Sequence, residues 1–252
     1  MSQLQRLAVS PSQIEADRLQ LTDRQQHYLM RVLRLQTGDR FIALDGAGHG
    51  WMAALQGREA VLLEPISTQT ELPIAVTLLI ALPKNGMDDI VRQATELGVS
   101  QIVPVLSARS LLNPSPQKLD RWQRIAQEAA EQSERQIVPA VLPPHRWQEA
   151  LQIGQDTGCD PGCDSGCCLY LCEARGDRPP LLTCLKAKLI DRANWLPVTL
   201  AVGPEGGWTE AEVEEAIAVG YQPVSLGKRI LRAVTAPIAA LALVGAVLDD
   251  VN

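Results

Sequence analysis

Two short apolar strands, each followed by a glycine-bearing loop, constrain the fold of this chain more than any other feature. The run Val198–Val202 leads directly into residues 203–207 (GPEGG), and residues 223–226 lead into a second loop at 227–232 (GKRILR). Short continuous apolar runs are typical of buried strands. Ligands of open α/β sheets bind outside the carboxyl ends of such strands, where glycine lets the backbone approach them closely. The two loops are therefore the predicted ligand site.

Helix signals follow both loops. Thr209 and Glu212 form a capping box that opens a helix, and Gly220 ends that helix. Thr235 and Pro237 start an apolar C-terminal helix. Neither loop has the G-x-G-x-x-G or G-x-x-x-x-G-K-[ST] spacing of a nucleotide-binding loop. Glycines that serve only turns and helix caps therefore stay an open alternative.

Residues 73–252 alternate between apolar strand-like runs and amphipathic helices, which predicts an α/β domain. Helices are predicted at 87–97, where Gly98 is the stop signal, and at 118–133. Besides the two strands named above, the strand-like runs lie at 75–82, 101–106, 137–141 and 168–172. The order of these strands in the sheet cannot be read from the pattern.

Residues 1–72 show a different pattern, with short β-type segments and one helix. Strands at 41–44 and 51–55 flank a turn-rich connection at 45–50. The glycines of this connection have a spacing (G-x-G-x-G) similar to that of a nucleotide-binding loop, but a strand follows where such a loop needs a helix. The change of pattern near residues 71–73 marks the predicted domain boundary.

The helix of the first part, capped by Thr22, carries a basic stripe. Its basic residues fall at spacings of three, four and three, so they share one helix face: Arg24, His27, Arg31 and Arg34. The apolar residues of the same segment are expected on the opposite side, packed on the strands: Leu29, Val32 and Leu33. An outward basic face suits the phosphates of RNA, and an ordinary solvated face is the alternative.

The distribution of charge favours the N-terminal part as an RNA-facing surface. The net charge of −6 argues at first against a polyanionic partner. Residues 1–70 hold seven Lys and Arg against seven Asp and Glu, so the whole charge of −6 falls on residues 71–252. Phosphate contacts need locally clustered cations and not a basic chain, so an acidic total does not exclude RNA.

The apolar residues predict a cytoplasmic protein with no membrane contact. No charged segment precedes an apolar run near the first residue, and the longest apolar run, at 238–248, is too short to span a bilayer. A helix that is apolar all round must be buried on more than one side. Residues 238–248 therefore also predict a homodimer that forms through the C-terminal domain.

Most of the cysteines crowd one glycine-rich stretch: Cys159, Cys163, Cys167, Cys168 and Cys172. Structural zinc sites usually combine one such pair with a second, distant pair, but here Cys184 stands alone and no histidine is near. A cytosolic context argues against disulfides. We therefore expect no metal site, and we assign Cys168 and Cys172 to a buried strand.

Four stretches spread over most of the chain carry a recognisable pattern. They are HYLMRVLRLQTGD at 27–39, MDDIVRQATELGV at 87–99, GPEGG at 203–207 and LGKRILR at 226–232. Together they resemble the RsmE group of SPOUT-class RNA methyltransferases, which methylate N3 of a uridine in 16S ribosomal RNA. The resemblance implies a SPOUT-like trefoil-knot α/β domain at 73–252 and a PUA-like β-barrel domain at 1–72. It also implies 16S rRNA or the small ribosomal subunit as the partner.

The resemblance further implies S-adenosyl-L-methionine as the cofactor, held where the knot brings the two loops together. The residues expected to bind it lie in these loops and at strand ends: Leu82, Glu173, Gly203, Pro204, Glu205, Gly206, Gly207, Leu226, Gly227, Ile230 and Leu231. The residues expected to bind RNA are basic: Arg24, His27, Arg31, Arg34, Lys84 and Arg109.

Arg232 and Glu205 are the candidate catalytic residues. Uridine N3 carries a proton, so its methylation requires deprotonation or a cation that stabilises the developing carbonyl charge. Arg232 suits the second role, because a guanidinium grips planar oxygen-bearing groups; a structural role is the alternative. Glu205 is either a base or a loop anchor. Where the family often has a glutamate, this chain has Val234, so the general base stays unassigned.

Two other functions remain open at this point. The chain could be a SPOUT methyltransferase that acts on transfer RNA, which the identity of the methylated RNA would reveal. It could also be a noncatalytic RNA-binding protein that keeps the knot as a scaffold, which cofactor binding would exclude.

Overall fold

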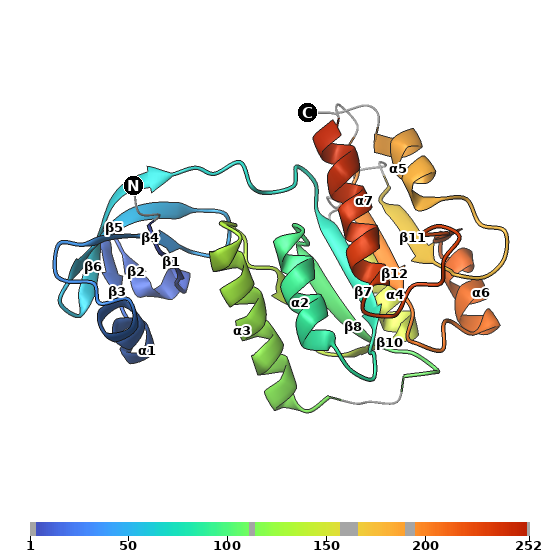
Figure 1. Cartoon of the computed structure of the whole chain (residues 1–252), viewed down its shortest axis with the longest axis horizontal. Helices are drawn as coiled ribbons and strands as arrows, with labels where there is room; N and C mark the ends of the chain where they lie inside the picture. Colours follow the sequence, from blue (N-terminus) through green and yellow to red (C-terminus); the bar gives the residue numbers. More distant parts are fainter. Residues whose placement is uncertain (1–3, 111–113, 157–165, 190–194, 251–252) are drawn as a thin grey trace. The chain divides into compact units, whose positions relative to one another are not determined.

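The chain folds into two units (Figure 1). The computed structural model describes residues 4–110, 114–156, 166–189 and 195–250. Unit 1 consists of Met1–Glu71 with Gln127–Val138, and unit 2 consists of Leu72–Ala126 with Pro139–Asn252. The sequence pattern gave a single boundary near residues 71–73. It contained no sign that residues 127–138 would join the first unit.

Unit 1 is built on a six-stranded sheet with the order β1-β4-β5-β6-β3-β2. Only β1 and β4 pair in parallel; the other neighbours are antiparallel. The apolar faces enclose a core that includes Leu19, Leu29 and Phe41, all fully buried. The strands of this unit are β1 (Arg6–Ala8), β2 (Ile14–Glu15), β3 (Arg18–Gln20), β4 (Arg40–Leu44), β5 (Gly50–Gln56) and β6 (Glu59–Ile66), with a short 3₁₀ helix, η1 (Pro11–Gln13).

The predicted hairpin of unit 1 is confirmed as β4 and β5. Its connection is held by the Asp45 carboxylate, which accepts hydrogen bonds from the N–H of Ala47 at 2.8 Å and the N–H of His49 at 3.0 Å. The His49 ring, through Nδ1, lies 2.8 Å from the same carboxylate. Burial alone would raise the pKa of Asp45, but these contacts together lower it. The glycines of this loop therefore serve a turn.

The basic helix of unit 1 is shorter and less regular than its spacing predicts. Thr22 caps α1 (Asp23–His27) through a capping box with Gln25, and the chain continues as a π-helix, η2 (Tyr28–Val32). The predicted inward position of Val32 is wrong, since 57% of it is exposed. The wider π turn changes the angular step between residues, so a 3.6-residue period no longer gives the buried face. Arg34 lies beyond the helix with a φ of +59°, so the stripe is not one continuous helix face.

Unit 2 contains a seven-stranded sheet in which every pairing is parallel. Its order is β10-β8-β7-β12-β11-β13, and β9 pairs with β8. The central strands β7 and β12 are buried at every residue, as expected for a sheet covered on both faces. The strands are β7 (Val76–Ala81), β8 (Gln101–Leu106), β9 (Ala140–Val141), β10 (His145–Arg146), β11 (Cys168–Cys172), β12 (Val198–Val202) and β13 (Gln222–Val224). The predicted α/β organisation is confirmed.

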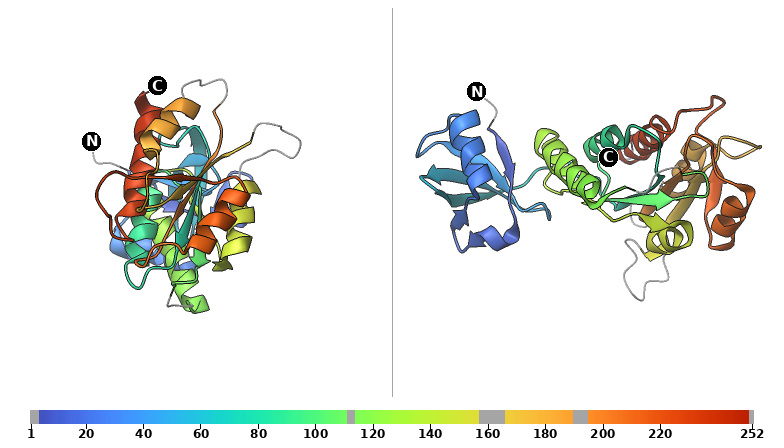
Figure 2. Two further views of the ribbon diagram at one scale, coloured as in Figure 1. Left: turned by 90° about the vertical axis from the view of Figure 1, so that its right-hand side faces the viewer. Right: turned by 90° about the horizontal axis from the view of Figure 1, so that it is seen from below.

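Helices cover both faces of this sheet (Figure 2). Helices α2, α5 and α7 pack together on one face, and α4 and α6 lie on the other. On the second face, Trp147 and Trp208 join the core formed with the sheet. The helices are α2 (Met87–Glu96), α3 (Pro116–Gln132), α4 (Trp147–Asp156), α5 (Leu181–Leu189), α6 (Glu210–Ala218) and α7 (Ala236–Asp250). Within the described ranges, no helix combines the length and the apolar character that crossing a bilayer requires.

Three predicted strands are shorter in the structure, and the one at 75–82 loses only its two end residues. Of residues 137–141, only Ala140–Val141 form a strand, because the backbone of Ile137 bridges to Ala47 and Val138 donates to the Gly46 carbonyl, both within unit 1. The strand predicted at 223–226 ends at Val224. After that point the Ser225 hydroxyl accepts the Gly227 N–H, which starts the loop.

Candidate functional site

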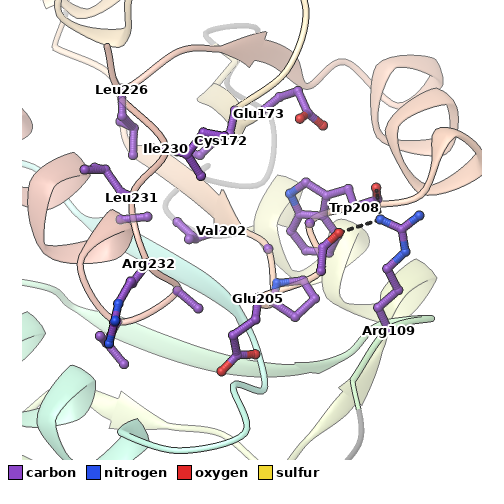
Figure 3. A pocket seen from close by; sticks show the side chains of 18 of the residues that line it. Arg109, Cys172, Glu173, Val202, Glu205, Trp208, Leu226, Ile230, Leu231 and Arg232 are labelled. Atoms are coloured by element: carbon purple, nitrogen blue, oxygen red, sulfur yellow. Dashed lines mark hydrogen bonds between the residues drawn. The ribbon is translucent and has the colours of Figure 1, made fainter. Parts of the chain in front are cut away.

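A cavity of about 800 Å³ lies where β11, β12 and β13 end in unit 2 (Figure 3). Both glycine-bearing loops line it, together with residues that follow β11 and the start of α2. The lining residues are Asn85, Gly86, Asp89, Arg109, Cys172, Glu173, Ala174, Arg175, Val202, Gly203, Pro204, Glu205, Gly206, Gly207, Trp208, Leu226, Gly227, Arg229, Ile230, Leu231, Arg232, Ala233, Val234 and Ala236. Its volume falls within the usual range of small-molecule sites.

The first loop forms a tight turn between β12 and α6. Gly207 has a φ of +70° and donates its N–H to the Pro204 carbonyl, a conformation that favours glycine. The predicted capping box of Thr209 and Glu212 is confirmed at the start of α6. The buried Glu212 carboxylate also accepts the Ala108 N–H at 2.7 Å, which ties the helix start to the segment after β8.

Arg109 supports the first loop from outside. Its Nη1 donates to the carbonyl oxygens of Gly206 at 2.5 Å and Trp208 at 3.2 Å. A Cβ on Gly206 would lie 3.0 Å from the Arg109 Cδ, so glycine allows this close approach. Arg109, which we expected to bind RNA, is thus engaged with loop carbonyls through one of its nitrogens.

Glu205 fastens the first loop to the segment after β7. Its Oε1 accepts the backbone N–H of Lys84 at 3.0 Å. Lys84 itself does not line the cavity, although the residues directly after it, Asn85 and Gly86, do. Of the two roles considered for Glu205, this contact corresponds to the loop anchor.

The second loop leads from β13 into α7. Gly227 has a φ of +115°, and Ile230 is 79% exposed. The Arg232 carbonyl accepts the N–H groups of Thr235 and Ala236, which forms the turn before α7. The Arg232 side chain is exposed, and among the residues that the structure describes no carboxylate forms an ion pair with it. Its guanidinium therefore stays available at the cavity (Figure 3).

Val234 occupies the position where the resemblance would supply a carboxylate. Its Cγ1 lies 2.5 Å from the place that a Cβ on Gly86 would occupy, so this valine packs against the start of α2. The carboxylates that line the cavity are instead Asp89, Glu173 and Glu205. Asp89 pairs with Arg92 at 2.9 Å, and the Glu173 carboxylate accepts the Arg175 N–H at 2.9 Å.

Trp208 forms the wall of the cavity directly after the first loop, and sequence reasoning missed it. Its ring stacks on Trp147 with centroids 4.4 Å apart. Its indole nitrogen is buried, and no described protein atom accepts a hydrogen bond from it. The signal that could have revealed it is its place between a ligand-loop glycine and a helix cap, where an aromatic side chain must face inward.

Most of the residues predicted to bind a cofactor line this one cavity. The exception is Leu82, which is buried and donates its N–H to the Val105 carbonyl at 3.0 Å, so its place at the cofactor stays a prediction. It lies one residue beyond β7, where the backbone still pairs with β8.

The basic stripe belongs to unit 1, separate from the cavity residues of unit 2. All members of the stripe are exposed: Arg24, His27, Arg31 and Arg34. Arg24 lies 3.6 Å from the Glu128 carboxylate in an exposed ion pair. Such pairs contribute little to stability, so Arg24 can exchange this partner for a phosphate.

The cysteine stretch lies only partly within the described residues. Cys168 and Cys172 lie in β11, as predicted, and burial raises the pKa of the Cys172 thiol to about 12. Cys159 and Cys163 fall outside the described residues. Across the described part of the chain, no group of three His, Cys, Asp or Glu side chains is arranged to hold a metal ion.

The cavity fits S-adenosylmethionine in size and in its polar groups. The carboxylate of Glu173 supplies an acceptor, and the indole N–H of Trp208 supplies a donor. The loops have glycine at positions 203, 206, 207 and 227. Because glycine has no side chain, a ligand can come close enough to form hydrogen bonds with the main chain there.

Comparison with protein families assigns the chain to a class. Residues 70–245 match the family described as "RNA methyltransferase domain", and residues 21–66 match the "RNA methyltransferase PUA domain". These matches and the parallel sheet with its strand-end cavity define an RNA methyltransferase of the α/β class that carries a PUA domain.

Individual relatives narrow the assignment. The chain is 50% identical to ribosomal RNA small subunit methyltransferase E of Synechocystis sp. over 97% of this chain and 78% of the relative. It is 32% identical to the protein of the same name from Bacillus subtilis over 91% and 90% of the two chains. The structure of that methyltransferase from Neisseria gonorrhoeae, bound to S-adenosyl methionine, is 33% identical with a TM-score of 0.77 and covers 95% of this chain and 96% of its own. The chain belongs to the ribosomal RNA small subunit methyltransferase E family, so the resemblance to the RsmE group is confirmed.

Proposed function

We propose that the protein transfers a methyl group from S-adenosylmethionine to N3 of a uridine in 16S ribosomal RNA. The cavity at the strand ends carries this proposal, because it gathers both glycine-bearing loops and an exposed arginine in one small-molecule site. The relatives from Synechocystis and Bacillus subtilis bear the name of small-subunit RNA methyltransferases, and the relative from Neisseria gonorrhoeae binds S-adenosyl methionine. These names support the substrate and the cofactor.

The chain's own groups mainly bind and orient the reactants. S-adenosylmethionine supplies an activated methyl group on its sulfonium. Methyl transfer of this kind is an in-line displacement, so alignment of donor and acceptor supplies a large part of the rate. The loops at 203–207 and 226–231 hold the cofactor through backbone groups, and the buried wall of Val202 and Trp208 keeps water away.

Arg232 acts on the acceptor base. Its side chain lies at the cavity without a carboxylate partner among the described residues, so its charge is available to a uracil carbonyl oxygen as N3 loses its proton. Glu205 acts as the loop anchor through Lys84. No carboxylate stands at position 234, so stabilisation of the uracil anion by Arg232 carries more of the catalysis than proton removal by a fixed base.

The two parts of the chain divide the work. Unit 1, which residues 127–138 join, serves as the RNA-binding domain, and unit 2 serves as the methyltransferase domain. The basic residues of the first part contact phosphates, which supply affinity without reading sequence. Lys84 and Arg109 add positive charge on the side of the cavity.

The protein forms a homodimer through α7. One side of this helix packs in the core of unit 2, whereas its other side presents exposed or half-buried apolar residues: Ala239, Ala242, Leu243 and Ala246. Leu182 of the neighbouring α5 is 38% exposed. Small and apolar residues on one helix face suit close packing against a second copy.

A methylation assay in vitro tests the proposed function. Small ribosomal subunits and total transfer RNA from a strain that lacks this protein are incubated with the purified protein and labelled cofactor. We expect label at a single uridine of 16S rRNA, and conversion of that base to N3-methyluridine by mass spectrometry. Label on transfer RNA alone would favour the transfer-RNA enzyme, and no cofactor binding by a folded protein would favour a noncatalytic scaffold.

A further inference from the structure

The indole nitrogen of Trp208 is a buried polar group with no partner among the described residues of this protein. Trp208 is 6% exposed, and its Nε1 atom is buried without a hydrogen bond. A buried donor without an acceptor costs free energy, so most native proteins pair such groups. An unpaired donor at the wall of a ligand cavity therefore needs an explanation.

The place of this nitrogen links it to the ligand. Trp208 lines the cavity (Figure 3), and the nitrogen edge of its ring lies against Gly203 of the first loop. Gly203 covers this edge: a Cβ on Gly203 would lie 3.2 Å from the Nε1 atom. Because Gly203 has no side chain, a small shift of its backbone opens the approach to the N–H.

The neighbouring tryptophan shows that the fold can satisfy such a group when it serves packing alone. Trp147 is 3% exposed and stacks on Trp208. Its Nε1 donates to the Glu212 carbonyl at 3.1 Å. Of these two adjacent buried indoles, only the ring at the cavity has a donor without a hydrogen-bond partner among the described residues.

We infer that the Trp208 N–H donates a hydrogen bond to an acceptor atom of S-adenosylmethionine, and that Trp208 is a cofactor-positioning residue. This inference rests on the proposed function, because it concerns the same cavity. Trp208 belongs to the buried core of unit 2, so its donor is already held in place and little conformational entropy is lost when the cofactor binds. The acceptors available on the cofactor are its carboxylate, its ribose oxygens and its adenine nitrogens.

Matched variants test this inference by calorimetric titration with S-adenosylmethionine in the absence of RNA. Trp208→Phe keeps an aromatic ring but removes the donor, and Trp147→Phe removes a donor that is satisfied inside the protein. We expect Trp208→Phe to weaken cofactor binding about fivefold to tenfold, as for one lost hydrogen bond. Trp147→Phe should leave the dissociation constant within about twofold of the wild type.

Thermal unfolding of the cofactor-free protein supplies a second readout, in which the expected order of the two variants is reversed. Trp208→Phe removes an unsatisfied donor, so its melting temperature should fall less than that of Trp147→Phe. The latter loses a made hydrogen bond, which for a chain of this size corresponds to a decrease of about 2–4 °C. Replacement of Trp208 by benzothienylalanine, which keeps the bicyclic shape without the N–H, separates the donor from ring volume.

The outcomes are distinct. Weaker cofactor binding by both Trp208 replacements, with normal binding by Trp147→Phe, supports the inference. Wild-type affinity in the benzothienylalanine protein overturns it while the proposed function stands. A wild-type protein that does not bind S-adenosylmethionine overturns the proposed function and the inference together.

Titration with 5′-methylthioadenosine, which lacks the amino-acid part of the cofactor, then locates the acceptor. If the wild type and the Trp208 variant still differ in dissociation constant, the acceptor lies in the nucleoside half. If they no longer differ, it lies in the amino-acid half.

Discussion

The two units bury their strands in different ways, and this difference decides what single residues in each can do. In unit 2, β7 and β12 are buried at every residue, whereas β6 of unit 1 alternates between buried and more exposed positions over its first half. Parallel strands end at a common edge, so unit 2 brings residues that are far apart in sequence to one cavity. The largely antiparallel sheet of unit 1 offers a solvated surface instead.

The basic residues of the two units follow the same division. Arg232 is also exposed, but it lines the cavity proposed to hold the cofactor and the acceptor base, so its guanidinium is expected to act on one charge that develops beside it. The stripe arginines of unit 1 are exposed, where salt screens each contact. We therefore expect large effects from single changes in unit 2 and smaller, additive effects in unit 1.

The largest expected effect is the loss of methyl transfer in Arg232→Ala. Removal of a group that stabilises transition-state charge typically lowers the rate about a hundredfold to a thousandfold. Cofactor affinity should change little, because backbone groups hold the cofactor. Single-turnover rates at saturating cofactor and RNA measure the effect, with Arg146→Ala, an exposed arginine of unit 2 outside the cavity lining, as the control.

A lysine at position 232 should retain little of the wild-type rate, because lysine offers a point charge in place of a planar fork. Near-normal turnover in Arg232→Ala would make the arginine structural, and the catalytic cation would then have to be sought at Arg229 or Lys84.

The second prediction concerns the exposed face of α7. Leu243→Glu places a charge in the proposed interface of each copy, and burial of like charges should weaken self-association about a hundredfold. Sedimentation over a range of protein concentrations measures the dimer. Glu214→Gln, a change on the exposed side of α6, is the control. A wild-type protein that stays monomeric at every concentration would remove the dimer from the proposal.

The third prediction tests the surface of unit 1. Replacement of Arg24, Arg31 and Arg34 by alanine should lower RNA affinity about tenfold at low salt. The slope of log affinity against log salt should decrease by about two for three lost phosphate contacts. The control replaces Arg18, Arg40 and Arg58, which are also exposed in unit 1 and carry the same total charge. If both triple variants lowered RNA affinity equally, the stripe would contribute only through total charge and not through specific phosphate contacts.

The smallest effect is expected at the hairpin turn of unit 1. Its contacts hold the pKa of Asp45 below the usual range, so its contribution to stability is present above the unfolded pKa and is lost as the pH falls through the folded one. Asp45→Asn should cost about 1 kcal/mol at neutral pH and reduce the loss of stability toward pH 3. Urea unfolding measures both, with Asp17→Asn as the control. An unchanged pH dependence would contradict the assigned role.

Much of the site could be predicted because glycine, proline and cap residues act locally. The turn at residues 203–207 and the capping box of Thr209 and Glu212 follow from the residues within a few positions of each other. Continuous apolar runs also predicted β8, β11 and β12 to the residue. These features depend on local sterics and burial, which the sequence carries directly.

The failures share a different cause. Val32 is exposed because the backbone widens into a π-helix, which a 3.6-residue period does not anticipate. Residues 137–138 leave their predicted strand because they pair within unit 1. In each case a partner distant in sequence, or a change of backbone geometry, overrides the local pattern.

The sequence by itself thus determined the buried strands β8, β11 and β12, the two loops and the family to which the chain belongs, since each depends on neighbouring residues or on a motif. Only the tertiary structure decided that Arg109 supports loop carbonyls, that Glu205 fastens the loop to Lys84, and that the Trp208 donor has no partner among the described residues. The first two are contacts between residues about a hundred positions apart, and the third depends on which atoms pack around a buried side chain. Such contacts are set by the packing of the parallel sheet and its helices, which no local sequence pattern encodes.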